Sequence, residues 1–182
     1  MKNKLDNVSM VGRLAYLIMC CEAYLKNNYP DRDWTFVAKN MWEATNSEYW
    51  ENWTDKYVGF IPSVLFDYPE YNEDDLKECF TREQFNLLKT LYSGLTKGIE
   101  NDKNDKFARI ISAPFDYCNA YDGAGIGDGS EGYALIDKVE NILSENNIPL
   151  PDYHKVEFTP FSEFNGWENE FDGTFLSIIL NK

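Results

Sequence analysis

Apolar side chains recur at steps of three and four residues along much of this 182-residue chain, and this spacing limits the fold more than any other feature. The first such stretch carries Val11, Leu14, Ile18, Cys21 and Leu25. These positions share one side of an α-helix. The pattern predicts a first helix that ends within residues 27–30, where two asparagines precede a tyrosine and a proline.

Further helices are expected along the chain. Asp31 or Asp33 is placed to cap a second helix with an apolar stripe over 34–42, and Asn46 or Ser47 to cap a third over 50–57. Two prolines make 61–71 a predicted connector. Additional helices are predicted over the ranges 72–80, 81–98, 107–112 and 135–143.

Three further predictions concern where helices begin and end. Thr81 and Gln84 have the spacing of a capping box, in which each side chain bonds the backbone amide of the other residue. Gly98 is placed to end the helix that starts there. Pro114 is expected to stop the helix that begins at Phe107, because proline removes a helical hydrogen bond.

Four tryptophans, at positions 34, 42, 50 and 53, fall within two of the expected helices. They favour core packing over an aromatic binding wall, since they follow the helical period and each buried aromatic removes a large area from water. Residues after Pro149 follow no single period. The fold class we predict is therefore mainly α: one domain over 1–182, an irregular helical bundle with an extended or irregular C-terminal segment.

The charge of the chain restricts its partners. There are 31 acidic and 17 basic side chains, for a net charge of −14, and residues 99–182 alone carry −10. Such a field repels phosphate backbones and anionic lipid head groups. We expect no nucleic-acid partner and no membrane partner, and the asymmetry favours a cationic protein partner, although acidity for solubility alone remains an alternative.

The compartment follows from two observations. The apolar N-terminal stretch, residues 8–21, is interrupted by Arg13 and reads as an amphipathic helix rather than a signal peptide, and no run is long enough to span a bilayer. The four cysteines have no C-x-x-C spacing, which favours reduced, buried thiols. We expect a cytoplasmic protein.

A glycine-rich stretch over 122–132 matches G-x-G-x-x-G at its end, and Asp122, Asp128 and Glu131 lie within it. Those acids would repel a pyrophosphate, no strand is expected to precede the loop, and the spacing does not fit an EF-hand. We predict neither dinucleotide nor calcium binding there, and no cofactor or metal elsewhere. His154 is the only histidine, and a surface or strand role is predicted for it.

No catalytic motif is present, so we expect a protein that is not an enzyme; an enzyme with a carboxylate-based site and an acidic scaffold subunit remain alternatives. The candidate binding segment is 164–173, where aromatic and acidic residues alternate. Aromatic anchors ringed by carboxylates suit a Lys- and Arg-rich surface, although Trp167 also suits the core. The predicted partner-binding residues are Asp122, Asp128, Glu131, Trp167, Glu168, Glu170 and Asp172.

The chain also resembles, in style, the small acidic immunity proteins that neutralise secreted bacterial toxins. The resemblance rests on the N-terminal helix with its sequence at 12–17, the tryptophan-bearing stretch Trp34 to Trp42, and the C-terminal sequence at 172–177. It implies stoichiometric binding to a basic partner, such as a toxin domain, and it assigns no binding residue. Immunity or inhibitor protein is thus the predicted function.

Overall fold

Helices dominate the computed structural model, which describes residues 4–99, 104–121, 131–161 and 170–181. Within these ranges no strand forms, and the single β contact is an isolated bridge between Val8 and Pro160. The α-helices are α1 (Met10–Asn28), α2 (Thr35–Glu43), α3 (Trp50–Tyr57), α4 (Pro62–Asp67), α5 (Glu73–Leu76), α6 (Arg82–Tyr92), α7 (Lys106–Asn119) and α8 (Glu131–Glu145). Short 3-10 turns are η1 (Ala44–Asn46), η2 (Val58–Phe60), η3 (Tyr153–Val156) and η5 (Gly173–Leu176). The prediction of a mainly α fold is confirmed.

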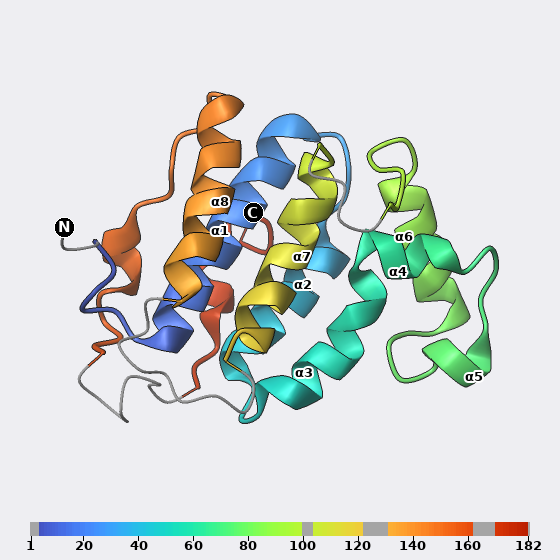
Figure 1. Ribbon diagram of the computed structural model, residues 1–182, viewed down its shortest axis with the longest axis horizontal. Helices are drawn as coiled ribbons and strands as arrows, with labels where there is room; N and C mark the ends of the chain where they lie inside the picture. Colours follow the sequence, from blue (N-terminus) through green and yellow to red (C-terminus); the bar gives the residue numbers. More distant parts are fainter. Residues whose placement is uncertain (1–3, 100–103, 122–130, 162–169, 182) are drawn as a thin grey trace.

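Helix α1 is the centre of the bundle. Every residue from Met10 to Leu25 is buried, and the helix packs against α2, α7 and α8 (Figure 1). A helix that is apolar on nearly all sides must be covered on all sides. Its two buried charged residues, Arg13 and Glu22, are therefore the positions where the core needs specific polar partners.

Helices α3 to α6 extend the bundle on one side, at the right of Figure 1. A continuous row of rings runs from α3 to α6. Trp53 stacks on Tyr57 with ring centroids 4.5 Å apart, and Tyr57 stacks on Phe60 at 5.0 Å. Phe60 then meets Phe80, which contacts Phe85 on α6. The three tryptophans at 34, 42 and 53 are buried and Trp50 is half-buried, so the core interpretation of the tryptophans is confirmed.

The first helix ends at Asn28, as its pattern predicts. The predicted capping box is present at the start of α6. The amide of Gln84 donates to the Thr81 hydroxyl at 3.3 Å, and the Thr81 amide donates to Gln84 Oε1 at 2.8 Å. The predicted end of that helix is wrong. Helix α6 stops at Tyr92, because Gly94 adopts a left-handed conformation (φ 76°) that is strained for other residues.

The stop predicted at Pro114 is also wrong, because α7 continues through the proline to Asn119. Pro114 is buried, and α7 packs against α1, α3, α4 and α8, so this packing outweighs the lost hydrogen bond. The predicted connector over 61–71 contains α4, which starts with Pro62 in the first turn where proline is tolerated. Neither Asn46 nor Ser47 caps α3, which begins after Tyr49 without a side-chain cap.

Cys20, Cys21 and Cys118 are buried, Cys79 is half-buried, and none forms a disulfide. Burial raises the pKa of Cys20 to about 12, so its thiol stays protonated. Among the described helices, none combines the length and the apolar character required to cross a lipid bilayer.

Candidate protein-binding surface

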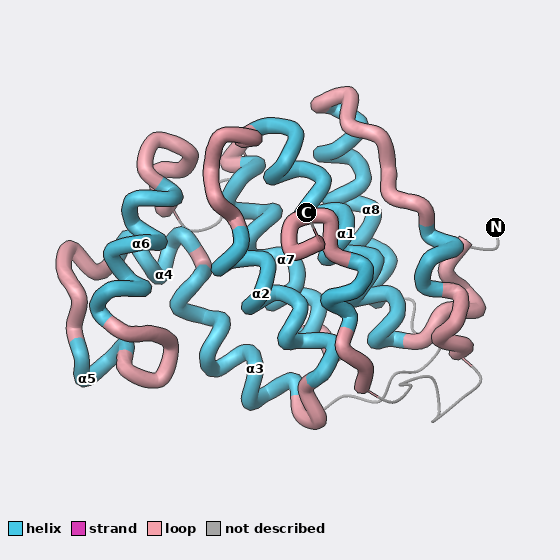
Figure 2. The backbone as a smooth tube through the Cα atoms, turned by 180° about the vertical axis from the view of Figure 1, so that it is seen from behind, coloured by secondary structure: helices cyan, strands magenta, loops and turns pink. Residues whose placement is uncertain are grey.

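The C-terminal segment 170–181 lies across the face of the bundle that is turned away in Figure 1 and faces the reader in Figure 2. It has no long helix of its own, so its position depends on bonds to other elements. The amide of Phe171 donates to the Thr45 carbonyl at 2.9 Å, and the amide of Gly173 donates to Thr45 Oγ1 at 3.0 Å. These two bonds fix the start of the segment against η1.

Gly173 allows the segment to approach the bundle closely. A Cβ atom at this position would lie 2.6 Å from Cε3 of Trp42 and 2.7 Å from Thr45 Oγ1. Both distances are shorter than real Cβ atoms show. Only glycine therefore fits at this first position of η5, against the tryptophan of α2.

The end of the segment is held by a buried carboxylate. Glu22 on α1 is fully buried, and its Oε1 atom accepts from Ser177 Oγ at 2.5 Å and from Trp42 Nε1 at 2.8 Å. Its Oε2 atom accepts from the amide of Ile178 at 2.7 Å. Burial raises the pKa of Glu22, while these donors oppose the shift. One carboxylate thus joins α1, α2 and the C-terminal segment.

Three phenylalanines gather on the outer side of this anchored segment. The ring of Phe158 lies 5.2 Å from that of Phe171 and 5.8 Å from that of Phe175, and the Phe171 and Phe175 rings are 6.4 Å apart. Phe158 is 52% exposed and Phe175 is 61% exposed, whereas Phe171 is half-buried. We call Phe158, Phe171 and Phe175 the phenylalanine cluster.

Acidic side chains flank the cluster in sequence. Glu157 precedes Phe158, while Glu170 and Asp172 stand on either side of Phe171, and all three acids are exposed. Asp172 Oδ1 accepts from the Thr174 hydroxyl at 2.6 Å and from its amide at 3.0 Å, and these bonds lower the pKa of Asp172. Asp172 is therefore both a cap for η5 and a fixed negative charge beside the cluster.

Two neighbouring features complete the surface. His154 is exposed, as predicted, and its Nδ1 atom lies 2.9 Å from Glu157 Oε2, which raises the pKa of His154. On the other side, Asp172 and Thr174 line a hollow of about 320 Å³ between α2 and α3, whose remaining wall includes Glu43 and Lys56. The cluster is thus bordered by charged groups and by a depression wide enough for a side chain.

Of the seven predicted binding residues, the structure describes three, and two of these lie at the phenylalanine cluster. Glu170 and Asp172 stand at the phenylalanine cluster, whereas Glu131 is exposed in the first turn of α8, a different element that packs on α1 and α7. Asp122, Asp128, Trp167 and Glu168 lie outside the described residues. The sequence interpretation missed Phe158 and Phe175. The available signal was their position in aromatic-rich sequence that lacks a helical period.

Comparisons with known proteins give no match: no family model fits the chain, and no curated protein or solved structure is significantly similar to it. Across the ranges that the structure describes, no group of three or more His, Cys, Asp or Glu side chains is arranged to hold a metal ion.

Proposed function

We propose that this chain is a stoichiometric protein-binding module that docks a cationic partner on the phenylalanine cluster and its acidic border. The observation that carries the proposal is the exposure of Phe158 and Phe175 beside Phe171 in a molecule that buries most of its other described aromatic side chains. Exposed aromatic groups of this kind are typical anchors at protein interfaces.

The charge supports a basic partner. Glu157, Glu170 and Asp172 adjoin the anchors in sequence and are exposed, and the chain as a whole carries −14. Such a field accelerates the approach of a cationic surface and repels an acidic one. The aromatic anchors then supply the short-range contacts that keep the complex together.

The surface is also preorganised. The segment that carries Phe171 and Phe175 is held by contacts of Thr45, Gly173 and Glu22. Its backbone is therefore already ordered before a partner binds. A preformed surface loses less conformational entropy on association than a segment that must fold onto its partner.

Within this class, we favour a bacterial immunity or inhibitor protein that acts in the cytoplasm on a basic toxin domain. The resemblance in style to immunity proteins supports this choice, as do the acidic charge and the anchored aromatic surface. Inhibition requires only that the partner's functional surface is covered, so no turnover is involved.

The test is co-expression with the protein encoded by the adjacent gene, followed by purification and kinetic measurement of the complex. We expect a one-to-one complex whose association slows by roughly one decade at low ionic strength when Glu157 and Glu170 are changed to Gln. Salt-independent association, or unchanged kinetics in this variant, would show that the acids only solvate the surface.

A further inference from the structure

The phenylalanine cluster offers aromatic ring faces to solvent as well as apolar area. Phe158 and Phe175 are each more than half exposed. The three rings of the cluster are inclined to one another by 49° to 74°, so they do not stack and do not shield one another's faces. The face of an aromatic ring carries partial negative charge and attracts cations.

Elsewhere in this chain, such ring faces are paired with the chain's own cations. The guanidinium carbon of Arg13 lies 4.6 Å from the ring centroid of Tyr133 and 4.8 Å from that of Phe161. The Lys89 ammonium lies 4.6 Å from the ring centroid of Phe66. Contacts between a cation and a ring face therefore recur in the described part of the chain.

Phe158 differs in this respect from Phe161, which follows it by three positions. The half-buried Phe161 ring carries the Arg13 guanidinium, whereas the exposed Phe158 ring does not. Over the residues that the structure describes, no lysine or arginine lies on any ring of the phenylalanine cluster. The cluster is thus open to a cation from another molecule.

The acids that adjoin the cluster largely keep their negative charge. Asp172 accepts two bonds from Thr174, and these neutral donors do not cancel its charge. Within the described ranges, no lysine, arginine or histidine forms an ion pair with Asp172 or with the exposed Glu170. Glu157 alone shares its charge, with His154. The field at the cluster therefore favours a cationic group over a neutral one.

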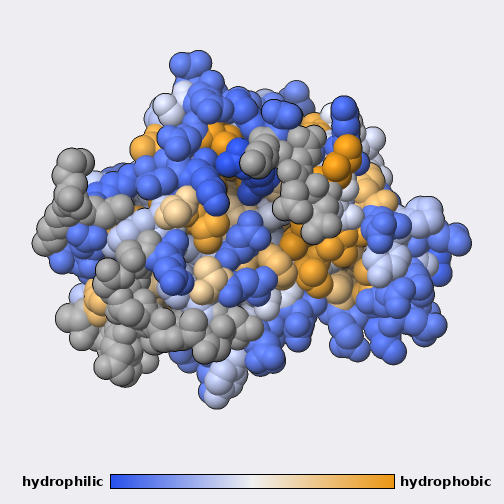
Figure 3. Space-filling model, viewed as in Figure 1, coloured by the Kyte–Doolittle hydropathy of each residue, from blue (hydrophilic) through white to orange (hydrophobic). Residues whose placement is uncertain are grey.

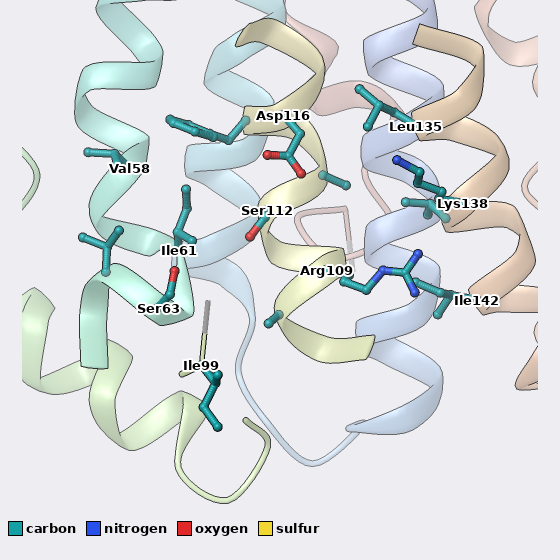
Figure 4. Close-up of a pocket in the computed structure, with 15 residues that line it drawn as sticks. Val58, Ile61, Ser63, Ile99, Arg109, Ser112, Asp116, Leu135, Lys138 and Ile142 are labelled. Atoms are coloured by element: carbon teal, nitrogen blue, oxygen red, sulfur yellow. The ribbon is translucent and has the colours of Figure 1, made fainter. Parts of the chain in front are cut away.

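An apolar groove on another face of the molecule has the opposite character. This groove of about 660 Å³ follows α7, and its apolar surface is seen between α7 and the α3–α4 region in Figure 3. Its lining includes Arg109, Lys138 and one acid, Asp116 (Figure 4). Burial raises the pKa of Asp116, and the charge of Lys138 opposes that shift. A cationic group would meet two basic side chains in this groove, so the cluster is the better site for it.

We propose that the partner group bound on the phenylalanine cluster is an arginine side chain, whose guanidinium lies on the exposed ring faces of Phe158 and Phe175. A guanidinium is planar and weakly hydrated, so it stacks on aromatic rings more readily than the strongly hydrated ammonium of lysine. Arg13 adopts this arrangement within the same chain, over two rings. The inference rests on the proposed function, because it names the group that the docking surface recognises.

The first experiment titrates the full chain, with isotope-labelled phenylalanine rings, with an acetylated and amidated Gly-Arg-Gly peptide. We expect saturable NMR shifts at the Phe158 and Phe175 rings and none at the buried ring of Phe107. Matched peptides with citrulline, leucine or lysine in place of arginine should bind at least about threefold more weakly, because the first two lack the charge and the third is more strongly hydrated. Equal affinity of any of these peptides, or no saturable shift at the cluster, would overturn the inference.

Phe175→Leu tests the ring face separately from charge and apolar character. The variant keeps an exposed apolar side chain and the same net charge, so the arginine peptide should bind it about three- to fivefold more weakly than wild type. Tyr49→Leu is the matched control, because it removes a ring that is 60% exposed but lies outside the cluster, and it should leave the affinity unchanged. Unchanged affinity in Phe175→Leu would contradict a role for the ring face.

The complex with the co-expressed partner distinguishes failure of this inference from failure of the proposed function. We expect Phe175→Leu to dissociate from the partner nearly as fast as Phe175→Ala, since both substitutions remove the ring. If Phe175→Ala dissociates faster but Phe175→Leu behaves like wild type, the cluster is an apolar anchor; the proposed function then stands and the arginine assignment is overturned. An unchanged dissociation rate in both variants would overturn both.

Discussion

Glu22 and Ser177 are 155 positions apart in the chain, yet Ser177 Oγ donates to Glu22 Oε1 at 2.5 Å inside the protein. The same carboxylate accepts from Trp42 and from the amide of Ile178, so one buried charge connects the central helix to the C-terminal segment. The position of the phenylalanine cluster depends on this connection.

Replacing Glu22 by Ala should therefore lower the free energy of unfolding by about 3 kcal/mol, since two buried donors and the part-buried amide of Ile178 lose their acceptor. Urea unfolding measures this change. Glu43→Ala on the exposed side of α2 is the matched control and should change stability by no more than about 0.5 kcal/mol. Equal effects of the two substitutions would refute the role assigned to Glu22.

The pH dependence of Glu22 has a definite sign. Burial raises its pKa in the folded protein above the ordinary value of 4.5, so the folded state binds the proton more tightly than the unfolded state. The contribution of Glu22 is therefore fully present below pH 4.5 and is lost as pH rises through the raised folded-state pKa. Relative to Glu22→Gln, which does not titrate, the wild-type protein should lose stability across that interval. A difference that grows with pH in urea titrations would contradict the assignment.

Gly173→Ala should displace the C-terminal segment, because the new methyl group would meet the Trp42 ring and Thr45 Oγ1. We expect a loss of about 1–3 kcal/mol in unfolding free energy and faster hydrogen exchange at the Ile178 amide. Gly94→Ala is the comparison, because nothing lies within 4 Å of its added Cβ and its cost comes only from the positive φ. Unchanged exchange at Ile178 in Gly173→Ala would show that the segment does not depend on this close approach.

Arg13 is fully buried, and its guanidinium donates to the carbonyls of Leu5 and Val8. It also lies over the Tyr133 ring at 4.6 Å. Lysine cannot reproduce this planar set of contacts. Arg13→Lys should therefore cost about 2–4 kcal/mol in thermal or urea unfolding, whereas Arg82→Lys at an exposed site should cost little. Similar melting temperatures for the two variants would count against the role of Arg13.

The helical part of the fold is largely predictable from sequence because its signals are local. The spacing in α1 and the Thr81–Gln84 capping box depend on residues three or four apart. The failures have nonlocal causes: α7 continues through Pro114 because four helices pack against it. A proline rule that considers one segment cannot include that packing.

The candidate surface was likewise only partly predictable from the sequence. Glu170 and Asp172 were predictable because they adjoin Phe171 in sequence. The contact of Phe158 with Phe171 and Phe175 was not, since it depends on how Glu22 and Thr45 hold a segment with no helical period.

The central claim is that the phenylalanine cluster anchors a cationic partner, and the most direct measurement compares Phe175→Ala with Leu87→Ala. Both side chains are exposed, Phe175 in the cluster and Leu87 on α6. With the partner from the co-expression experiment, Phe175→Ala should raise the dissociation rate about 30-fold or more, a cost of about 2 kcal/mol, while its melting temperature stays near wild type. Leu87→Ala should leave the dissociation rate unchanged. An unchanged dissociation rate for Phe175→Ala, or equal effects of the two substitutions, would contradict the account.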